Sequence, residues 1–94
     1  MDNKDIWVVI PAYNESKHIS GVIKKTEKYC SNIIIIDDGS KDDTYEIAKS
    51  LNVYVLKNIV NMGKGASLKT GCDFAIKNEA KKLIVMDADG QHNP

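Results

Sequence analysis

Four short runs of branched apolar residues, separated by three longer segments of helical periodicity, constrain the fold of this chain more than any other feature. The runs do not alternate with polar residues, which is typical of strands in a parallel sheet covered on both faces. The segments between them place apolar residues three and four positions apart, as amphipathic helices do. The predicted strands are residues 6–10, 33–36, 53–56 and 83–86, and the predicted helices are residues 15–30, 41–51 and 64–80.

Strand–helix alternation of this kind predicts an α/β fold with right-handed crossovers. We expect a Rossmann-like three-layer sandwich with a mainly parallel four-stranded sheet in the order 3-2-1-4. Ligands bind such sheets beyond the carboxyl ends of the strands, where the strand order reverses. The segments after the first, second and fourth strands are therefore the first candidates for a site. The 94 residues allow one small domain.

Composition narrows the classes of function. The formal net charge is zero, which argues against a nucleic-acid binder. The chain has thirteen lysines and no arginine, so phosphate groups would have to be bound by lysine, backbone N–H groups or a metal. Cys30 and Cys72 lack metal-ligand spacing and are interpreted as reduced, half-buried thiols. Because no signal peptide or membrane-spanning run is present, we expect a cytoplasmic protein.

Acidic residues gather where the predicted strands end. Seven of the thirteen acids lie in residues 11–16, 37–43 and 87–94. Carboxylates crowded at one edge repel each other unless a cation joins them, and a divalent metal is the natural counter-ion. The seven acids are Glu15, Asp37, Asp38, Asp42, Asp43, Asp87 and Asp89.

The most informative of these segments carries two aspartates separated by one residue, Asp87 and Asp89. Two such carboxylates can approach one hard cation, and Mg²⁺ or Mn²⁺ would keep waters and accept substrate phosphates. Gln91 and His92 lie within reach as further ligands, although His92 is as well interpreted as a bystander. A simple turn-capping role for the two aspartates is the alternative.

The segment after the second strand begins with Asp37 and Asp38, of which one is expected to point toward the crevice and the other toward a helix or turn. A carboxylate in the crevice can accept hydrogen bonds from a base or a ribose. The alternative is a turn with Gly39 at positive φ and Ser40 as the helix cap, and both interpretations can hold together. Ser40 with Asp43 also resembles a capping box.

The segment after the first strand lacks the glycine fingerprint of a dinucleotide turn. Tyr13 could stack on a base, and Glu15 could bond a base or sugar; Asn14 or Ser16 could cap the following helix. Residues 61–67 fail the Walker pattern because glycine follows Lys64, yet they form a glycine-rich helix start that could accept an anion. A flexible helix-entry turn explains that segment equally well.

Four motifs follow one another along the chain and cover nearly all of it. They are Val9-Ile10-Pro11-Ala12-Tyr13-Asn14-Glu15, Ile36-Asp37-Asp38-Gly39-Ser40-x-Asp42, Asn61-x-Gly63-Lys64-Gly65 and Met86-Asp87-Ala88-Asp89-Gly90-Gln91-His92-x-Pro94. In this order they resemble the family 2 glycosyltransferases of the GT-A fold, in particular the branch that includes dolichol-phosphate mannosyltransferase and polyprenyl-phosphate glycosyltransferases. Four motifs in order make this resemblance more specific than any single motif.

This resemblance implies transfer of a sugar from a metal-bound GDP- or UDP-sugar to an acceptor. The expected acceptor is a lipid phosphate, such as polyprenyl or dolichyl phosphate, or a saccharide. It implies Mg²⁺ or Mn²⁺ as cofactor and, for the full-length protein, a place at the cytoplasmic face of the membrane. By similarity, the donor-binding residues would be Pro11, Tyr13, Glu15, Ile36, Asp38, Asp87, Ala88 and Asp89, and the metal ligands would be Asp87, Asp89 and Gln91.

Family members are considerably longer, so residues 1–94 are expected to be the donor-binding half, which binds donor but is not expected to turn over alone. The catalytic residues and the acceptor site would lie in the other half. A nucleotidyltransferase-like sugar-phosphate enzyme is an alternative, but it would need a glycine-rich basic loop after the first strand. A non-catalytic nucleotide-binding module is another. A receiver module would need a phosphorylatable aspartate where the third strand ends in Lys57 and Asn58.

Overall fold

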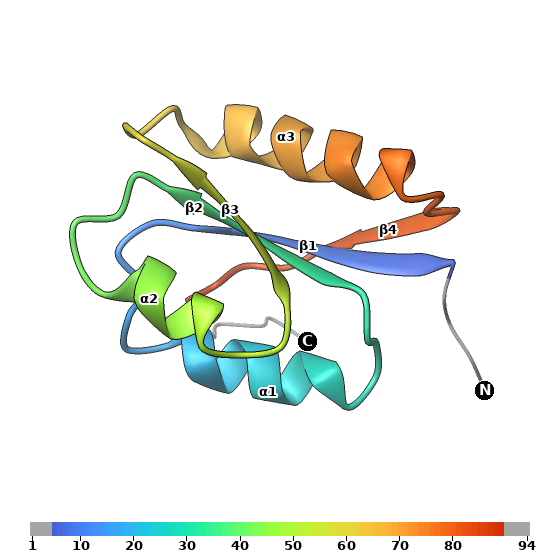
Figure 1. The fold of residues 1–94 in the computed structure, drawn as a ribbon, viewed down its shortest axis with the longest axis horizontal. Helices are drawn as coiled ribbons and strands as arrows, with labels where there is room; N and C mark the ends of the chain where they lie inside the picture. Colours follow the sequence, from blue (N-terminus) through green and yellow to red (C-terminus); the bar gives the residue numbers. More distant parts are fainter. Residues whose placement is uncertain (1–4, 90–94) are drawn as a thin grey trace.

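A computed structural model describes residues 5–89. Its four strands form one parallel sheet in the order β3-β2-β1-β4, which confirms the predicted topology. Helix α3 covers one face of the sheet, and α1 and α2 cover the other (Figure 1). The elements are β1 (Ile6–Ala12), α1 (Ile19–Glu27), β2 (Ile33–Asp38), α2 (Thr44–Lys49), β3 (Tyr54–Asn58), α3 (Lys64–Lys77) and β4 (Lys82–Val85).

The core consists of two apolar layers on opposite faces of β1 and β2. Successive side chains of a strand point to opposite faces, so the four isoleucines of β2 divide between the layers, and all four are fully buried. Ile33 and Ile35 join the layer beneath α1 and α2, whereas Ile34 and Ile36 join the layer beneath α3. The two cysteines are unpaired thiols, as predicted; Cys72 is half-buried, whereas Cys30 is buried more deeply than predicted.

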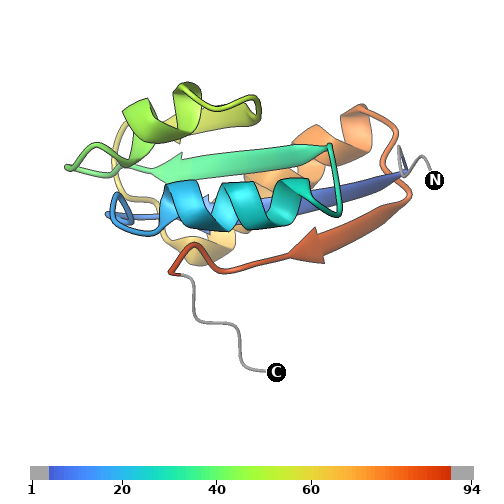
Figure 2. The ribbon, with the colours of Figure 1, turned by 90° about the horizontal axis from the view of Figure 1, so that it is seen from below.

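Strand β4 departs from the prediction of a strand buried on both faces. It lies at the edge of the sheet, seen in Figure 2, and all four of its residues are exposed. Leu83, Ile84 and Val85 are 37%, 48% and 49% exposed. Among the described strands β4 pairs with β1 only. Its apolar sequence therefore predicted more burial than the strand has at the edge of the sheet.

Strands β1, β2 and β3 are longer than predicted, and all three helices are shorter. β1 continues through Ala12, and β2 continues through Asp38, so both aspartates of residues 37–38 belong to the strand and not to a turn. α1 begins at Ile19 and α2 at Thr44.

The predicted side-chain caps of these two helices are also wrong. The N-cap positions of α1 and α2 are His18 and Asp43, and neither makes a side-chain capping bond. The physical reason is that the residues predicted as caps bond across the two loops instead, as described below.

Helix α3 approaches the sheet closely because Gly71 carries no side chain. A Cβ atom at Gly71 would lie 2.5 Å from Cγ1 of Val9 and closer still to Cδ1 of Ile36. Both neighbours are fully buried, so neither can move away easily. This contact fixes where α3 lies, and with it the start of α3 at Lys64. No helix within residues 5–89 has the length and apolar character needed to span a membrane.

Candidate functional site

A cavity of about 330 Å³ opens at the carboxyl ends of β1 and β2, beside the segment that follows β4. This is the edge where the strand order reverses, and the volume lies in the range of small-molecule sites. Strand ends and the β3–α3 loop all contribute to its wall. The lining residues are Pro11, Ala12, Tyr13, Glu15, Asp38, Asn61, Gly63, Lys64, Asp87, Ala88 and Asp89.

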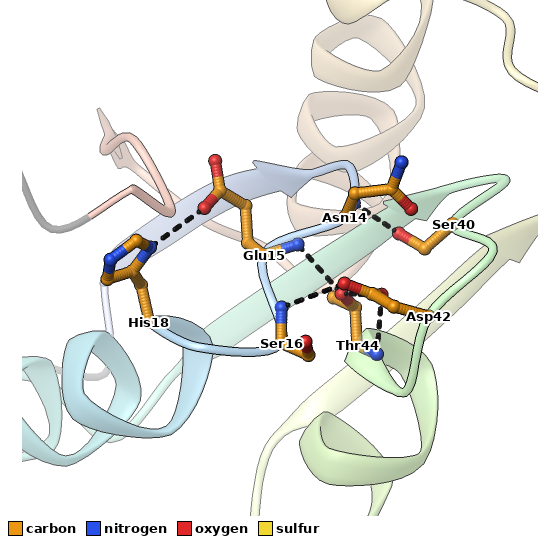
Figure 3. A network of polar contacts seen from close by, with 7 residues as sticks. All are labelled: Asn14, Glu15, Ser16, His18, Ser40, Asp42 and Thr44. Carbon is orange, nitrogen blue, oxygen red and sulfur yellow. Dashed lines mark hydrogen bonds and ion pairs between the residues drawn. The ribbon is translucent and has the colours of Figure 1, made fainter.

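The loop after β1 is tied to the loop after β2 by a set of hydrogen bonds that we call the loop clamp. Figure 3 shows its residues except Lys41. The residues are Asn14, Glu15, Ser16, Ser40, Lys41, Asp42 and Thr44. The Asn14 N–H donates to Ser40 Oγ at 2.8 Å, and the Lys41 N–H donates to Asn14 Oδ1 at 2.8 Å. Asn14 adopts a left-handed backbone conformation (φ 53°), which asparagine tolerates better than most residues.

Thr44 and Asp42 complete the clamp from the start of α2. The Glu15 N–H donates to Thr44 Oγ1 at 2.8 Å, and the Ser16 N–H donates to Asp42 Oδ2 at 3.2 Å. Thr44 is fully buried and in turn donates both its N–H and its hydroxyl to Asp42 Oδ1. The clamp therefore fixes the backbone at Glu15, one of the residues that line the cavity.

These bonds also set the charge state of Asp42. Burial raises the pKa of Asp42, but the hydrogen bonds from Thr44 and Ser16 outweigh it and lower the pKa from 3.8 to about 2. Asp42 therefore stays anionic well into the acid range. It serves the clamp and does not line the cavity, although the sequence grouped it with the other acids of this edge.

Glu15 and Tyr13 form the wall of the cavity on the β1 side. The Glu15 side chain is 24% exposed, and its Oε1 lies 3.1 Å from Nδ1 of His18, toward which it turns in Figure 3. Tyr13 is 42% exposed, so part of its ring can be contacted by a planar ligand.

Asp38 lies in the wall between β2 and the β3–α3 loop, and its carboxylate holds that loop in place. Its Oδ1 accepts the Met62 N–H at 2.7 Å and the Asn58 side-chain amide at 2.9 Å, while its Oδ2 accepts the Gly63 N–H at 2.9 Å. Burial raises the pKa of Asp38, and these bonds more than offset that effect, leaving the pKa below its usual value. The Ser67 hydroxyl is a fourth hydrogen-bond partner of Asp38, so the roughly four acceptor positions of this carboxylate are used within the chain.

The glycine-rich segment before α3 matches the interpretation as a helix-entry turn that relies on glycine. Its N–H groups at Met62 and Gly63 bind the chain's own Asp38 carboxylate. Gly63 has φ 99° at the N-cap of α3, which glycine adopts without strain. Gly39 has φ 73°, which confirms its predicted conformation.

Asp37 points away from the cavity because successive strand residues face opposite sides of the sheet. It shares the face of Ile33 and Ile35, is fully buried, and does not line the cavity. Within residues 5–89 neither oxygen of its carboxylate has a hydrogen-bond partner. The two neighbouring aspartates thus divide as predicted, with Asp38 at the crevice and Asp37 toward the helical face.

The segment after β4 brings Asp87 and Asp89 to the cavity opposite Glu15 and Asp38. Asp87 Oδ1 lies 2.8 Å from Nζ of Lys64, the first residue of α3. The hydrogen bond and charge of Asp87, together with the charge of Asp89, raise the pKa of Lys64. Lys64 and Asp87 are 23 positions apart in the chain and meet only in the folded protein.

The cavity suits a divalent cation of the Mg²⁺ or Mn²⁺ type. Asp87 and Asp89 present carboxylate oxygens to one space, and Asp87 already holds a cationic group there. No group of three or more His, Cys, Asp or Glu among residues 5–89 could hold a metal by itself. Two carboxylates suit an ion that completes its shell with waters and substrate phosphates. The predicted ligand Gln91, like His92, lies outside the described residues.

The structure thus brings together seven of the eight predicted donor-binding residues. The exception is Ile36, whose side chain packs in the core beneath α3 and does not line the cavity. Four lining residues were not among the predicted site residues: Ala12 ends β1, and Asn61, Gly63 and Lys64 come from the β3–α3 loop and the start of α3. The last three belong to the glycine-rich motif of residues 61–65, which leaves the same edge of the sheet.

A second cavity of about 370 Å³ lies between α1 and the edge strand β4. Its wall is mainly apolar, and among the described residues that form it Lys25 alone is charged. It contains no residue of the predicted site, so it provides an internal comparison for ligand mapping.

Comparisons with known proteins agree with this geometry. The chain is 50% identical over 95 residues to the uncharacterized protein MJ1222 of Methanocaldococcus jannaschii, covering 98% of this chain and 39% of that protein. It is 38% identical over 112 residues to UDP-N-acetylglucosamine–dolichyl-phosphate N-acetylglucosaminyltransferase of Methanococcus voltae, covering 100% of this chain and 45% of that protein. The chain therefore spans less than half the length of these relatives.

Among solved structures, the chain resembles glucosyl-3-phosphoglycerate synthase from Mycobacterium tuberculosis, crystallised with Mn²⁺, UDP and glucosyl-3-phosphoglycerate. The TM-score is 0.67 at 26% sequence identity, over 88% of this chain and 33% of that chain. This likeness confirms the predicted GT-A architecture. The family model for glycosyl transferase family 2 matches residues 7–94. On this match and on the shared fold, the chain belongs to glycosyl transferase family 2.

Proposed function

We propose that residues 1–94 form the nucleotide-sugar-binding part of a longer glycosyltransferase domain. The observation that carries this proposal is the convergence of Glu15, Asp38, Asp87 and Asp89 on one cavity at the switch point of the sheet. Membership in family 2 supports a sugar-transfer role over a nucleotidyltransferase. The extension of β1 through Ala12 supports it too, since no glycine-rich loop follows that strand directly.

The nucleoside would bind on the β1 and β2 side of the cavity. Tyr13 offers an exposed ring for stacking, and the carboxylate of Glu15 is held beside it by the loop clamp and His18. Asp38 would contribute to this side of the site by holding Met62 and Gly63 of the β3–α3 loop in place. Pro11 lines the same wall, whereas Ile36 would act through the shape it gives the end of β2.

The diphosphate would lie on the β4 side, near Asp87, Asp89 and Lys64. A divalent ion bound there would neutralise charge on the departing nucleoside diphosphate. Asp87 and Asp89 would hold that ion, with Gln91 as a further ligand, and Ala88 would contact the donor through its backbone. Lys64 would supply positive charge in a chain without arginine.

The class of donor and acceptor follows from what similar proteins use. The solved neighbour was crystallised with UDP and Mn²⁺, which supports a nucleoside-diphosphate donor of the UDP or GDP type and a divalent cofactor. The Methanococcus voltae relative is named for transfer to dolichyl phosphate. We infer a polyprenyl or dolichyl phosphate acceptor for the whole protein, which would then work at the cytoplasmic face of a membrane.

The proposal is tested by measuring the affinity of the chain for UDP and GDP by isothermal titration calorimetry, with and without Mn²⁺. We expect binding that strengthens at least tenfold when Mn²⁺ is present, because the ion bridges the carboxylates and the diphosphate. Asp89→Ala should lose this Mn²⁺ dependence. Asp73→Ala, which removes an exposed aspartate of α3 outside the cavity, is the matched control and should bind like the parent. Unchanged binding by Asp89→Ala would remove that residue from the site.

A further inference from the structure

We propose that Lys64 is a built-in counter-ion of Asp87, which the carboxylate exchanges for a divalent cation when the nucleotide donor binds. The inference rests on the proposed function, and it adds a role for a residue that the predicted site did not include. In the ligand-free protein the ammonium group of Lys64 occupies the cation position beside Asp87. In the donor complex the same ammonium group turns to the diphosphate.

The geometry of the pair supports exchange and not a permanent bond. Lys64 Nζ lies 2.8 Å from Asp87 Oδ1, and both side chains line the cavity. The two side chains are 60% and 51% exposed, and ion pairs in water contribute little to stability. A divalent ion carries twice the charge of an ammonium group and is held by more than one oxygen, so it can displace Lys64 without disturbing the fold.

The balance of charge in the cavity explains why such a counter-ion is needed. Four acidic side chains, Glu15, Asp38, Asp87 and Asp89, line the cavity within the described part of the chain. Lys64 is the one basic side chain among the described lining residues. Without donor or metal it partly offsets these acids, whereas a bound diphosphate brings negative charge that both the metal and the released lysine can neutralise.

The attachment of Lys64 keeps it within reach after it leaves Asp87. It is the first residue of α3, and the loop before it is held by the Asp38 carboxylate through Met62 and Gly63. The close approach at Gly71 fixes the same helix against the sheet. The backbone of Lys64 is therefore anchored on both sides while its long side chain remains exposed.

A matched ion pair on the same helix provides the control. Lys69 Nζ lies 3.0 Å from Asp73 Oδ2, with side-chain exposures of 78% and 57%, and neither residue lines the cavity. Lys64→Met and Lys69→Met each remove one ammonium group and keep an unbranched side chain. Comparing them separates the loss of a particular counter-ion from the loss of a lysine on α3.

The first experiment titrates Mn²⁺ alone, without nucleotide, into the wild-type chain and both variants. Because Lys64 competes with the ion for Asp87, Lys64→Met should bind Mn²⁺ about two- to fivefold more tightly than wild type. Lys69→Met should bind like wild type. Equal or weaker Mn²⁺ binding by Lys64→Met overturns the proposal.

The second experiment titrates UDP in saturating Mn²⁺. Here Lys64→Met should bind about fivefold or more weakly than wild type, because the released ammonium group no longer faces the diphosphate. The two expected effects have opposite signs, which a merely structural role of Lys64 would not produce. UDP affinity that equals that of wild type overturns the proposal as well.

A third measurement does not depend on substitutions. Addition of Mg²⁺ and UDP should shift the ¹³Cε resonance of Lys64 and leave that of Lys69 in place. An unmoved Lys64 resonance in the saturated complex contradicts exchange.

The outcomes also separate this inference from the proposed function on which it rests. If wild type binds UDP with Mn²⁺ but Lys64→Met binds Mn²⁺ no more tightly than wild type, the exchange is refuted and the donor site stands. A wild-type chain that binds neither UDP nor GDP refutes the donor site itself.

Discussion

The substitution Gly71→Ala tests whether α3 is seated on the sheet as closely as the structure indicates. The added methyl group would lie 2.5 Å from Cγ1 of Val9 and closer to Cδ1 of Ile36. Both partners are fully buried, and branching at Cβ restricts χ1 of each side chain, so movement away from the new methyl group is costly in the packed core. Overpacking of this kind costs about 1–3 kcal/mol.

The helix preference of alanine opposes this cost. Replacing glycine by alanine inside a helix gains up to about 1 kcal/mol. Gly21→Ala in α1 measures that gain separately, because a Cβ atom at Gly21 would meet nothing within 4 Å. The difference in unfolding free energy between the two variants therefore isolates the packing cost at Gly71. We expect Gly71→Ala to be less stable than Gly21→Ala by about 1–3 kcal/mol.

Urea unfolding followed by far-ultraviolet circular dichroism gives both free energies, and thermal unfolding gives a second reading. For a domain of this size, 1 kcal/mol corresponds to roughly 4–8 °C in the melting temperature. We expect the midpoint to rise in Gly21→Ala and to fall, or at best remain unchanged, in Gly71→Ala. If Gly71→Ala proves as stable as Gly21→Ala, α3 does not contact β1 and β2 as described, and the anchoring of Lys64 loses its basis.

Three further substitutions test the loops around the cavity. Gly39→Ala should destabilise the fold by about 2 kcal/mol or more, because Gly39 has φ 73° and the new Cβ would lie 2.6 Å from the backbone at Val60 and Asn61. Urea unfolding measures this loss, and an unchanged midpoint would contradict it. Thr44→Val should lower the free energy of unfolding by about 1–3 kcal/mol and weaken UDP binding, since it leaves the Glu15 N–H unpaired. If calorimetry finds both stability and UDP affinity unchanged, the clamp does not position Glu15. The pKa of Asp42 is lowered from 3.8 to about 2 in the folded state, so Asp42 stabilises the fold above pH 4 and this contribution is lost as the pH falls toward 2. Asp42→Asn should therefore be less stable than wild type at neutral pH, and the two stabilities should converge between pH 4 and 2; a constant difference would refute this linkage.

The strand order and the position of the site could be predicted from the sequence because they depend on burial patterns along the chain. A run of four isoleucines, such as residues 33–36, favours a strand covered on both faces, and four strands separated by helices leave few topologies. Polar residues directly after such strands must gather at one edge of the sheet. This reasoning placed Tyr13, Glu15, Asp38, Asp87 and Asp89 at the cavity without any contact being known.

What the sequence could not provide depends on contacts between segments far apart in the chain. Asn14 and Ser40 were predicted as helix caps. Instead, Ser40 Oγ accepts the Asn14 N–H, and Asn14 Oδ1 accepts the Lys41 N–H, so each side chain bonds the backbone of the other loop. The N–H groups of residues 62 and 63 suit a bound anion, and only the folded chain shows that Asp38 supplies it. The exposure of β4 likewise depends on its place at the edge, which apolar composition does not reveal.

The most direct test of the central proposal is to map UDP binding on the chain by two-dimensional ¹H–¹⁵N NMR in the presence of Mg²⁺. The account predicts that the shifted amides cluster around the first cavity, at Tyr13, Glu15, Gly63, Asp87 and Asp89. Amides along the apolar groove between α1 and β4, such as those of Lys25 and Ile84, should remain in place. Shifts that concentrate in that groove, or no shifts at millimolar UDP, would contradict the proposed donor site.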